Sequence, residues 1–293
     1  MIARALTAGR ATPADFVELT KPRITAMVLL TTLVGYVMAS GQGASLLQAV
    51  PVLVGVALVA AGANTLNMVL ERHTDALMRR TARRPLPAGR LRVIEALVFG
   101  LALTSAGLTG LLWMSGRWPA ALALLTWASY LFIYTPLKTR TSLCTVAGAF
   151  PGALPPVIGW AAARGAPEPG AFVLFAILFL WQIPHFLAIA WIYREDYARA
   201  GLPMLPVVDP QGLTTGRQAV ANSLALLLVS LAPAAGGMAG RAYLVGAVVL
   251  GLALTAVAVA SAVRRTNGAA RALFGASIVY LAALCTLLLV SRH

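Results

Sequence analysis

The sequence predicts an all-α protein embedded in a membrane, with nine helices that cross the bilayer and pack into one bundle. Hydrophobic residues make up 59% of the 293 residues, charged residues only 11%, and the mean hydropathy is +0.82. A soluble domain carries roughly 25% charged residues, so this chain has too few polar side chains to cover itself in water. We expect one membrane-embedded domain over residues 1–293, with a short segment, residues 1–23, before the first span.

Nine apolar runs are long enough to cross a bilayer. A spanning helix needs about 20 apolar residues, because the hydrocarbon layer is about 30 Å thick and each helical residue rises about 1.5 Å. The runs cover approximately residues 24–41, 46–70, 93–115, 118–136, 143–163, 169–193, 217–238, 242–262 and 269–290. The fifth run contains several glycines and prolines, which predicts a broken and closely packed helix.

Positive charge falls almost entirely on one side of this predicted topology. All but four of the 23 lysines and arginines lie on the side of the N-terminus, and the exceptions are Arg117, Arg164, Arg241 and Arg292. Because cytoplasmic loops retain Lys and Arg, the N-terminus and the charged loops are predicted to be cytoplasmic. Topology thus explains the net charge of +14, and nucleic acid is not an expected partner. No apolar signal-peptide core precedes residue 24, and we expect a bacterial plasma membrane rather than a mitochondrial one.

A stripe of polar side chains begins inside the second span and continues past its end. Spacings of three or four residues place its members on one helical face: Asn64, Asn67, Glu71, Asp75, Arg79 and Arg83. Two carboxylates one turn apart at the membrane boundary can hold Mg²⁺ together with phosphate oxygens, and the arginines can bind the same phosphates. The stripe therefore predicts a diphosphate site.

A simpler interpretation stays open for part of the stripe. Asp75 and Arg79 can form an ordinary ion pair one turn apart, with the arginines serving only to set topology. This interpretation does not explain Asn64 and Asn67, because polar groups inside a span are costly and mark functional sites. His73 lies off the stripe and is expected to be solvated.

A second polar group lies toward the cytoplasmic end of the sixth span. Gln182 and His185 interrupt the apolar run, Pro184 is expected to kink it, and Glu195 and Asp196 follow at its end. We interpret this face as the lining of a cavity. The two acids are either metal or phosphate-site residues or ordinary interfacial charges. His185 is either a packing residue, the commoner case for a lone helical histidine, or an iron ligand or catalytic base.

Four further residues carry reactive or charged side chains whose roles the sequence leaves to be considered. Tyr134 and Lys138 lie four residues apart at the inner end of the fourth span. Lys138 is either a phosphate contact or a topology charge, and the sequence favours neither. Cys144 and Cys285 lie in apolar surroundings without a metal-type spacing, and they are expected to fill space.

These residues resemble the motifs of the UbiA-type intramembrane prenyltransferases. Asn67, Glu71 and Asp75 resemble the family's NxxxDxxxD motif. Further similarity is carried by LTKPRI, RTARRPLPAGR, YTPLKTRT, GAFPGALPPVIGW, WQIPHFLAIAW and YREDYARAGLPMLPV, and it extends from residue 16 to about residue 208. Glu71 stands where the family usually has aspartate. The second acidic motif, DxxxD, is reduced to Asp196 with Ala200 in the partner position, a form typical of the branch that farnesylates haem.

The resemblance implies a nine-helix bundle around a central cavity that binds farnesyl diphosphate and haem b, with Mg²⁺ as cofactor. It implies that Asn67, Glu71, Asp75 and Asp196 hold the Mg²⁺ diphosphate as catalytic residues. The other expected substrate-binding residues are Asn64, Arg79, Arg83, Tyr134, Lys138, Gln182, His185 and Glu195. The implied reaction joins a farnesyl group to a haem vinyl group with addition of water, for haem-copper terminal oxidases. Haem-A and oxidase assembly proteins are candidate partners.

Two other functions stay open at this point. A related enzyme that prenylates a quinone precursor would carry a fuller second acidic motif and would have no reason for WQIPHF. A transporter would also place polar residues on kinked helices in the membrane, but it would not need acids and arginines clustered on one side.

Overall fold

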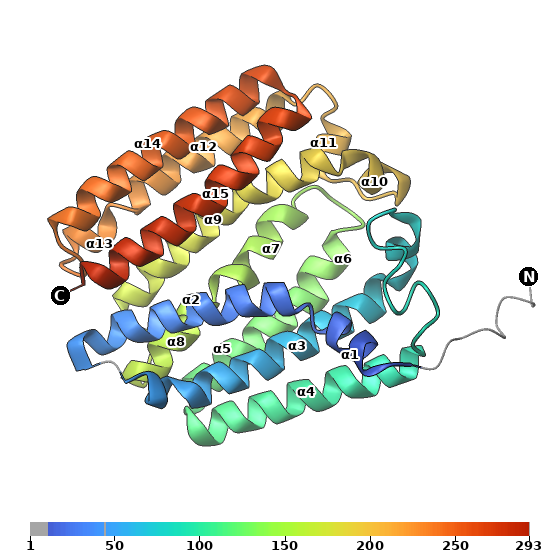
Figure 1. The fold of residues 1–293 in the computed structure, drawn as a ribbon, viewed down its shortest axis with the longest axis horizontal. Helices are drawn as coiled ribbons and strands as arrows, with labels where there is room; N and C mark the ends of the chain where they lie inside the picture. The colour runs from blue at the N-terminus through green and yellow to red at the C-terminus, as the bar shows by residue number, and fades with distance from the viewer. Residues whose placement is uncertain (1–10, 44, 293) are drawn as a thin grey trace, which may run out of the picture.

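The computed structural model describes residues 11–43 and 45–292, and residues 1–10 of the predicted N-terminal segment lie outside this range. The described residues form helices joined by loops, with no strand among them (Figure 1). Nine helical segments in this part of the chain are long and apolar enough to cross a membrane. The predicted all-α fold with nine spans is therefore confirmed.

The spans follow the predicted order, with shifts at their ends. They are α2 (Pro22–Ser40), α3 (Leu46–Leu77), α4 (Val93–Met114), α5 to α6 (Arg117–Leu137), α7 to α8 (Cys144–Arg164), α9 (Pro169–Ile192), α12 to α13 (Leu213–Ala235), α14 (Arg241–Arg264) and α15 (Asn267–Val290). Among the described residues, four short helices lie outside the spans: α1 (Pro13–Leu19), η1 (Gly41–Gly43), α10 (Arg194–Arg199) and α11 (Leu205–Val208).

Proline divides one span and leaves another whole. In the fifth span, α7 (Cys144–Ala153) ends just before α8 (Pro155–Arg164), so the predicted break is confirmed. Proline has no N–H to continue the hydrogen-bond ladder, and it suits the first turn of a new helix. In α9, by contrast, Pro184 lies inside one uninterrupted helix, so the bend expected at this proline does not divide the span.

The two halves of the chain lie on opposite sides of a middle group of helices. In Figure 1 the N-terminal spans α2, α3 and α4 lie on one side and the C-terminal spans α12, α14 and α15 on the other. Helix α3 packs extensively on α4 and α2 on α8, whereas α9 contacts α7, α12 and α15. The direct contact between α2 and α15 is slight. The halves are therefore joined mainly through α7, α8 and α9.

Two glycines bring α2 and α8 together at the level of the main chain. A Cβ atom on Gly35 would overlap the main chain of Pro156, and a Cβ atom on Gly159 would overlap the carbonyl of Thr32. Helices in lipid associate through close van der Waals packing, which favours small residues at their contacts. These glycines therefore set the distance between the two helices.

Replacing Gly159 by alanine should destabilise the bundle by about 1–3 kcal/mol, the usual cost of forcing an extra methyl group into a packed interface. The main chain of α2 cannot move aside as a flexible side chain can. Gly110 of α4 provides a matched control, because a Cβ atom there would meet nothing within 4 Å. Thermal unfolding of both variants in detergent measures the difference. Equal melting temperatures for the two variants would contradict the close contact.

The short helix α1 is held against the loop between α3 and α4 by one buried carboxylate. Asp15 accepts hydrogen bonds from the N–H and the hydroxyl of Thr12, at 3.0 and 2.7 Å, and from Arg90 Nε at 2.6 Å. Arg90 also donates to the carbonyl of Arg83 and to Glu18. The hydrogen bond from Arg90, together with those from Thr12, lowers the pKa of Asp15 to about 2.

The lowered pKa makes the contribution of Asp15 to stability depend on pH. The carboxylate stabilises the folded protein above its ordinary pKa of 3.8, and this contribution disappears as the pH falls through about 2. Asp15→Asn should therefore lower the melting temperature at neutral pH, and the difference from the unmodified protein should shrink below about pH 4. Thermal unfolding over this pH range measures it. Glu18→Gln, which removes an exposed partner of Arg90, is the control. A difference that stays constant down to about pH 2 would contradict the assignment.

Candidate active site

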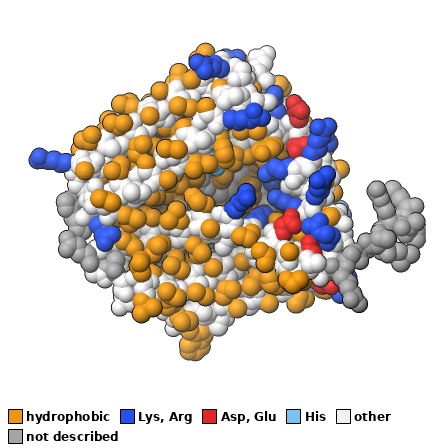
Figure 2. All heavy atoms as spheres, in the orientation of Figure 1, with side chains coloured by type: hydrophobic (Ala, Val, Ile, Leu, Met, Phe, Trp, Pro, Cys, Tyr) orange, Lys and Arg blue, Asp and Glu red, His pale blue; other side chains and the backbone are white. Residues whose placement is uncertain are grey.

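The polar stripe predicted on the second span lies at the charged end of the bundle. Figure 2 shows that most charged side chains on this face gather at one end, the end where α6 and α10 lie in Figure 1. Asn67 and Asp75 are each 1% exposed, and Glu71 is 8% exposed. Because these groups are shielded from water, they need partners within the protein or in a ligand.

Asn67 connects α3 to two other segments. Its Oδ1 accepts a hydrogen bond from Lys21 Nζ at 2.8 Å, and its Nδ2 donates to the hydroxyl of Thr135 at 3.1 Å. Lys21 directly precedes α2 and has a left-handed φ of 47°. Desolvation lowers the pKa of Lys21 to about 8, so its amine is still mainly charged at neutral pH. Sequence reasoning missed Lys21 and Thr135 as site residues, although the LTKPRI and YTPLKTRT segments contain them.

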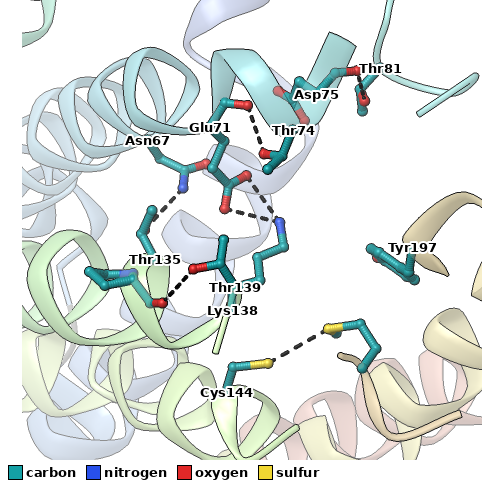
Figure 3. Close-up of polar contacts among 12 residues, drawn as sticks. Asn67, Glu71, Thr74, Asp75, Thr81, Thr135, Lys138, Thr139, Cys144 and Tyr197 are labelled. Atoms are coloured by element: carbon teal, nitrogen blue, oxygen red, sulfur yellow. Dashed lines mark hydrogen bonds and ion pairs between the residues drawn. The ribbon is translucent and has the colours of Figure 1, made fainter. Parts of the chain in front are cut away.

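Glu71 forms an ion pair with Lys138 (Figure 3). Lys138 Nζ lies 3.0 Å from each carboxylate oxygen of Glu71, and both side chains are largely buried. Lys138 follows α6 (Thr135–Leu137), which continues a π-helical turn, η2 (Ser129–Tyr134), and both segments contact α3. Pro136 cannot donate to the helical ladder and its ring crowds the preceding turn, which favours a widened turn at this point. Lys138 is therefore paired with a member of the stripe, and its role as a phosphate contact stays a prediction.

Tyr134 lies at the end of the π-helical turn. It packs against neighbouring side chains and forms no hydrogen bond to the stripe among the described residues. Its ring stacks on that of Tyr130, with 5.5 Å between ring centroids and 14° between ring planes. A Cβ atom on Gly148 of α7 would overlap the ring of Tyr134. Tyr134 therefore fills the space between the fourth span and α7, close to Lys138.

Asp75 has one partnered and one unpartnered oxygen. Its Oδ2 lies 2.7 Å from Arg84 Nη1. Its Oδ1 is buried and has no hydrogen-bond partner among the described residues. A buried carboxylate oxygen without a partner is unfavourable, so this atom is suited to bind a cation that enters with a ligand.

Helix α3 ends at Leu77, so the predicted continuation of the stripe to Arg79 and Arg83 is wrong. Beyond the end of the helix, a spacing of four residues no longer keeps side chains on one face. Arg84 reaches Asp75 instead, because the loop after α3 folds back. The alternative of an ion pair between Asp75 and Arg79 is wrong for the same reason.

One member of the second polar group reaches the segment that follows α3. Asp196, on α10, accepts a hydrogen bond of 3.4 Å from the main-chain N–H of Arg79 and pairs with Arg199 at 2.7 Å. Arg80 lies over the ring of Tyr193, 4.8 Å from the ring centroid. The structure thus brings Asp196 to the loop that follows Asp75. Sequence reasoning treated Arg80 only as a topology charge.

Two predicted site residues tie helices together. Asn64 Nδ2 donates to the carbonyl of Thr20 at 3.2 Å, which fixes the segment between α1 and α2. Gln182 Nε2 donates to the carbonyls of Ala149 and Leu178, at 3.2 and 3.1 Å. These bonds satisfy the buried amides within the protein, so their presence inside spans has a structural explanation.

The remaining predicted residues lie apart from the stripe's contacts. Glu195 is exposed on α10, and no side-chain partner for it occurs in the described part of the chain. His73 is exposed, as expected. His185 contacts Ser277 of α15 at 2.8 Å rather than a member of the stripe. The two cysteines are buried and unpaired, in agreement with a space-filling role.

The charges and donor atoms of the site suit a diphosphate with a hard cation. Three cations, Lys21, Lys138 and Arg84, surround the carboxylates of Glu71 and Asp75, which leaves an excess of positive charge. Residues 11–43 and 45–292 contain no group of three or more His, Cys, Asp or Glu side chains that could hold a metal ion. Mg²⁺ commonly uses one or two carboxylates and completes its shell with phosphate oxygens and water, so this donor set fits it.

The fold is similar to that of solved structures that match nearly the whole chain. One is digeranylgeranylglyceryl phosphate synthase, with a TM-score of 0.80 and 16% identity, over 95% of this chain and 97% of that one. Another is a UbiA homologue of Archaeoglobus fulgidus bound to GPP and Mg²⁺, with a TM-score of 0.69 and 20% identity, over 94% of this chain and 99% of that one.

Relatives with much higher identity match nearly the whole chain. The protoheme IX farnesyltransferase of Solibacter usitatus is 48% identical over 95% of this chain and 98% of its own length. That of Koribacter versatilis is 42% identical over 95% of this chain and 93% of its own length. The model of the UbiA prenyltransferase family matches residues 28–286. The chain therefore belongs to the UbiA prenyltransferase family.

Proposed function

We propose that this protein transfers the farnesyl group of farnesyl diphosphate to a vinyl group of haem b, with addition of water, and so makes haem O and diphosphate. Two relatives that match 95% of the chain are named protoheme IX farnesyltransferase, which supports this acceptor. The observation that carries the proposal is the buried carboxylate pair, Glu71 and Asp75, surrounded by Lys21, Lys138 and Arg84. Such a site, with its excess of cations, suits a charged diphosphate.

Mg²⁺ would be held by Glu71 and Asp75, with Asn67 and Asp196 completing the set proposed from the sequence. The unpartnered Oδ1 of Asp75 supports this assignment, because a bound cation would satisfy it. The UbiA homologue of Archaeoglobus fulgidus with GPP and Mg²⁺ bound supports the same cofactor. When bound, Mg²⁺ supplies positive charge that stabilises the leaving diphosphate.

The chain's own cations contribute to breaking the bond between the farnesyl carbon and the diphosphate oxygen. That oxygen keeps the electron pair, and Lys138, Arg84 and Lys21 stabilise the negative charge that develops on the diphosphate. The vinyl group donates its electron pair to the farnesyl carbon, which forms the new carbon–carbon bond. Water then adds to the vinyl-derived cation and loses a proton, giving a hydroxyl group. Burial of the site keeps water from reaching the first cation too early.

We assign this site to the cytoplasmic face of a bacterial plasma membrane. The supporting observation is that nearly all lysines and arginines lie on this side of the nine spans, as expected for cytoplasmic loops. Farnesyl diphosphate and haem would then enter from the cytoplasm or the inner leaflet. The product would serve haem-copper terminal oxidases, with oxidase assembly proteins as partners.

Purified protein should convert haem b to haem O when farnesyl diphosphate and Mg²⁺ are both present. Mass spectrometry detects the mass of the hydroxyethylfarnesyl haem, and a coupled assay detects the released pyrophosphate. The control is the same reaction without Mg²⁺ and with a chelator, which should give no haem O. Prenylation of a quinone precursor such as a hydroxybenzoate, with no haem product, would contradict the proposed acceptor. Uptake of a solute without pyrophosphate release would contradict a transferase altogether.

Asp75→Asn should lower the rate of haem O formation by about 100-fold, similar to the loss of a major electrostatic group in other active sites. The amide keeps the shape of the side chain but removes the charge that faces Arg84 and a cation. The Mg²⁺ concentration needed for half-maximal rate should also rise. Glu95→Gln is the matched control, because Glu95 lies in the first turn of α4, just after the loop that contains Arg84, and, among the residues that the structure describes, pairs only with Arg92. Full activity of Asp75→Asn at limiting Mg²⁺ would remove Asp75 from the proposed site.

A further inference from the structure

His185 lies on α9 between two residues that tie this helix to different neighbours. Trp181 Nε1 donates to the carbonyl of Ser277 on α15 at 2.6 Å, and Gln182 Nε2 donates to the carbonyl of Ala149 on α7 at 3.2 Å. With 3.6 residues per turn, His185 leaves the helix in a direction between those of Trp181 and Gln182. Its side chain therefore points toward the space between α7 and α15.

The ring of His185 has a fixed orientation. It stacks on the ring of Trp181, with 4.8 Å between centroids and 24° between planes, and on that of Phe274, with 4.9 Å and 30°. Both neighbours come from helices that span the bundle, α9 and α15. The imidazole is therefore held by its packing, and it does not need a ligand to keep this position.

A chain of two hydrogen bonds determines which ring nitrogen carries the proton. His185 Nδ1 lies 2.8 Å from Ser277 Oγ, which lies 2.7 Å from the carbonyl oxygen of Phe274. A carbonyl oxygen only accepts, so the serine hydroxyl donates its single hydrogen to Phe274. Both contacts are hydrogen bonds only if Nδ1 is protonated and donates to Ser277. Nε2 then has a free lone pair, with no protein partner for it among the described residues.

We propose that Nε2 of His185 binds the iron of the haem acceptor, and that Ser277 is a positioning residue that holds the imidazole in the required tautomer. Metal-binding histidines usually donate their second ring N–H to a nearby acceptor, which is the arrangement found here. This inference rests on the proposed function, because haem is the acceptor substrate there. His185 lies seven residues before the end of α9 at Ile192, about 10 Å along the helix, whereas Asp196 lies beyond that end on α10, so the iron would lie deeper in the membrane than the diphosphate.

Spectroscopy of bound haem tests iron ligation directly. Ferric haem b is titrated into detergent-purified protein and followed by absorption and electron paramagnetic resonance. The unmodified protein should give the spectrum of histidine-bound iron. His185→Ala and His185→Phe should both lose that spectrum and bind haem at least about 10-fold more weakly, and free imidazole should restore the spectrum of His185→Ala. The phenylalanine variant keeps an aromatic ring in the stack, so it controls for loss of packing.

Ser277 and the iron itself provide two further measurements. Ser277→Ala should weaken haem binding by about 10-fold and change its spectrum, similar to the loss of other groups that orient metal ligands. Ser223→Ala is the matched control, because Ser223 is also buried and donates to a helical carbonyl, that of Ala219. Metal-free protoporphyrin IX should bind the unmodified protein more weakly than haem does. In His185→Phe the two porphyrins should bind equally.

The outcomes separate this inference from the proposed function. If the unmodified protein makes haem O but both His185 variants keep the haem spectrum and affinity, iron ligation by His185 is wrong and the proposed function stands. The same conclusion follows if the variants lose activity while the spectrum is unchanged, because His185 then serves the reaction without binding iron. If the unmodified protein neither binds haem nor makes haem O, the proposed function itself fails.

Discussion

The burial of two carboxylates at the inner end of α3 determines how several distant segments are arranged. Glu71 is satisfied by Lys138 from the fourth span, and Asp75 by Arg84 from the loop that folds back after α3. Buried ion pairs contribute little net stability, because removing the charges from water offsets most of their attraction. Their value here lies in position, because in the proposed function the cations that pair with these carboxylates also receive the diphosphate.

The reduced second acidic motif fits this balance of charge. Ala200, which stands where the family pattern has a second acid, is buried in an apolar cluster with Met78, Tyr197 and Met204. A carboxylate at this position would need its own partner inside that cluster. Asp196 keeps contacts with Arg79 and Arg199 at the rim of the cluster, so one acid of the pair is retained where water and cations can reach it.

The spans and half of the site were predictable from local patterns, whereas the other half depends on contacts between distant segments. Hydropathy along a span is a local property, and helical phase correctly grouped Asn67, Glu71 and Asp75. The same helical phase wrongly placed Arg79 on this face, because nothing in the residue spacing indicates that α3 ends at Leu77. Arg84 contacts Asp75 instead, from the loop that follows α3. Lys21 and Thr135 follow no periodic pattern with the stripe. Asn64 and Gln182 resemble Asn67 in sequence context, and only the structure reveals that neighbouring carbonyls satisfy them.

Helix α9 links the two halves of the chain, and it also connects the proposed haem site to the proposed diphosphate site. It contacts α7 on one side and α12 and α15 on the other, while α2 and α15 touch only slightly. It carries His185 and leads directly into the helix of Asp196. A Cβ atom on Gly152 of α7 would overlap the amide of Gln182, so α7 and α9 pack closely at this point. The separation between a haem bound at His185 and a diphosphate at Asp75 therefore depends on how the helices pack, because α9 is uninterrupted from Pro169 to Ile192 and Asp196 on the following α10 contacts the main chain of Arg79, just beyond α3.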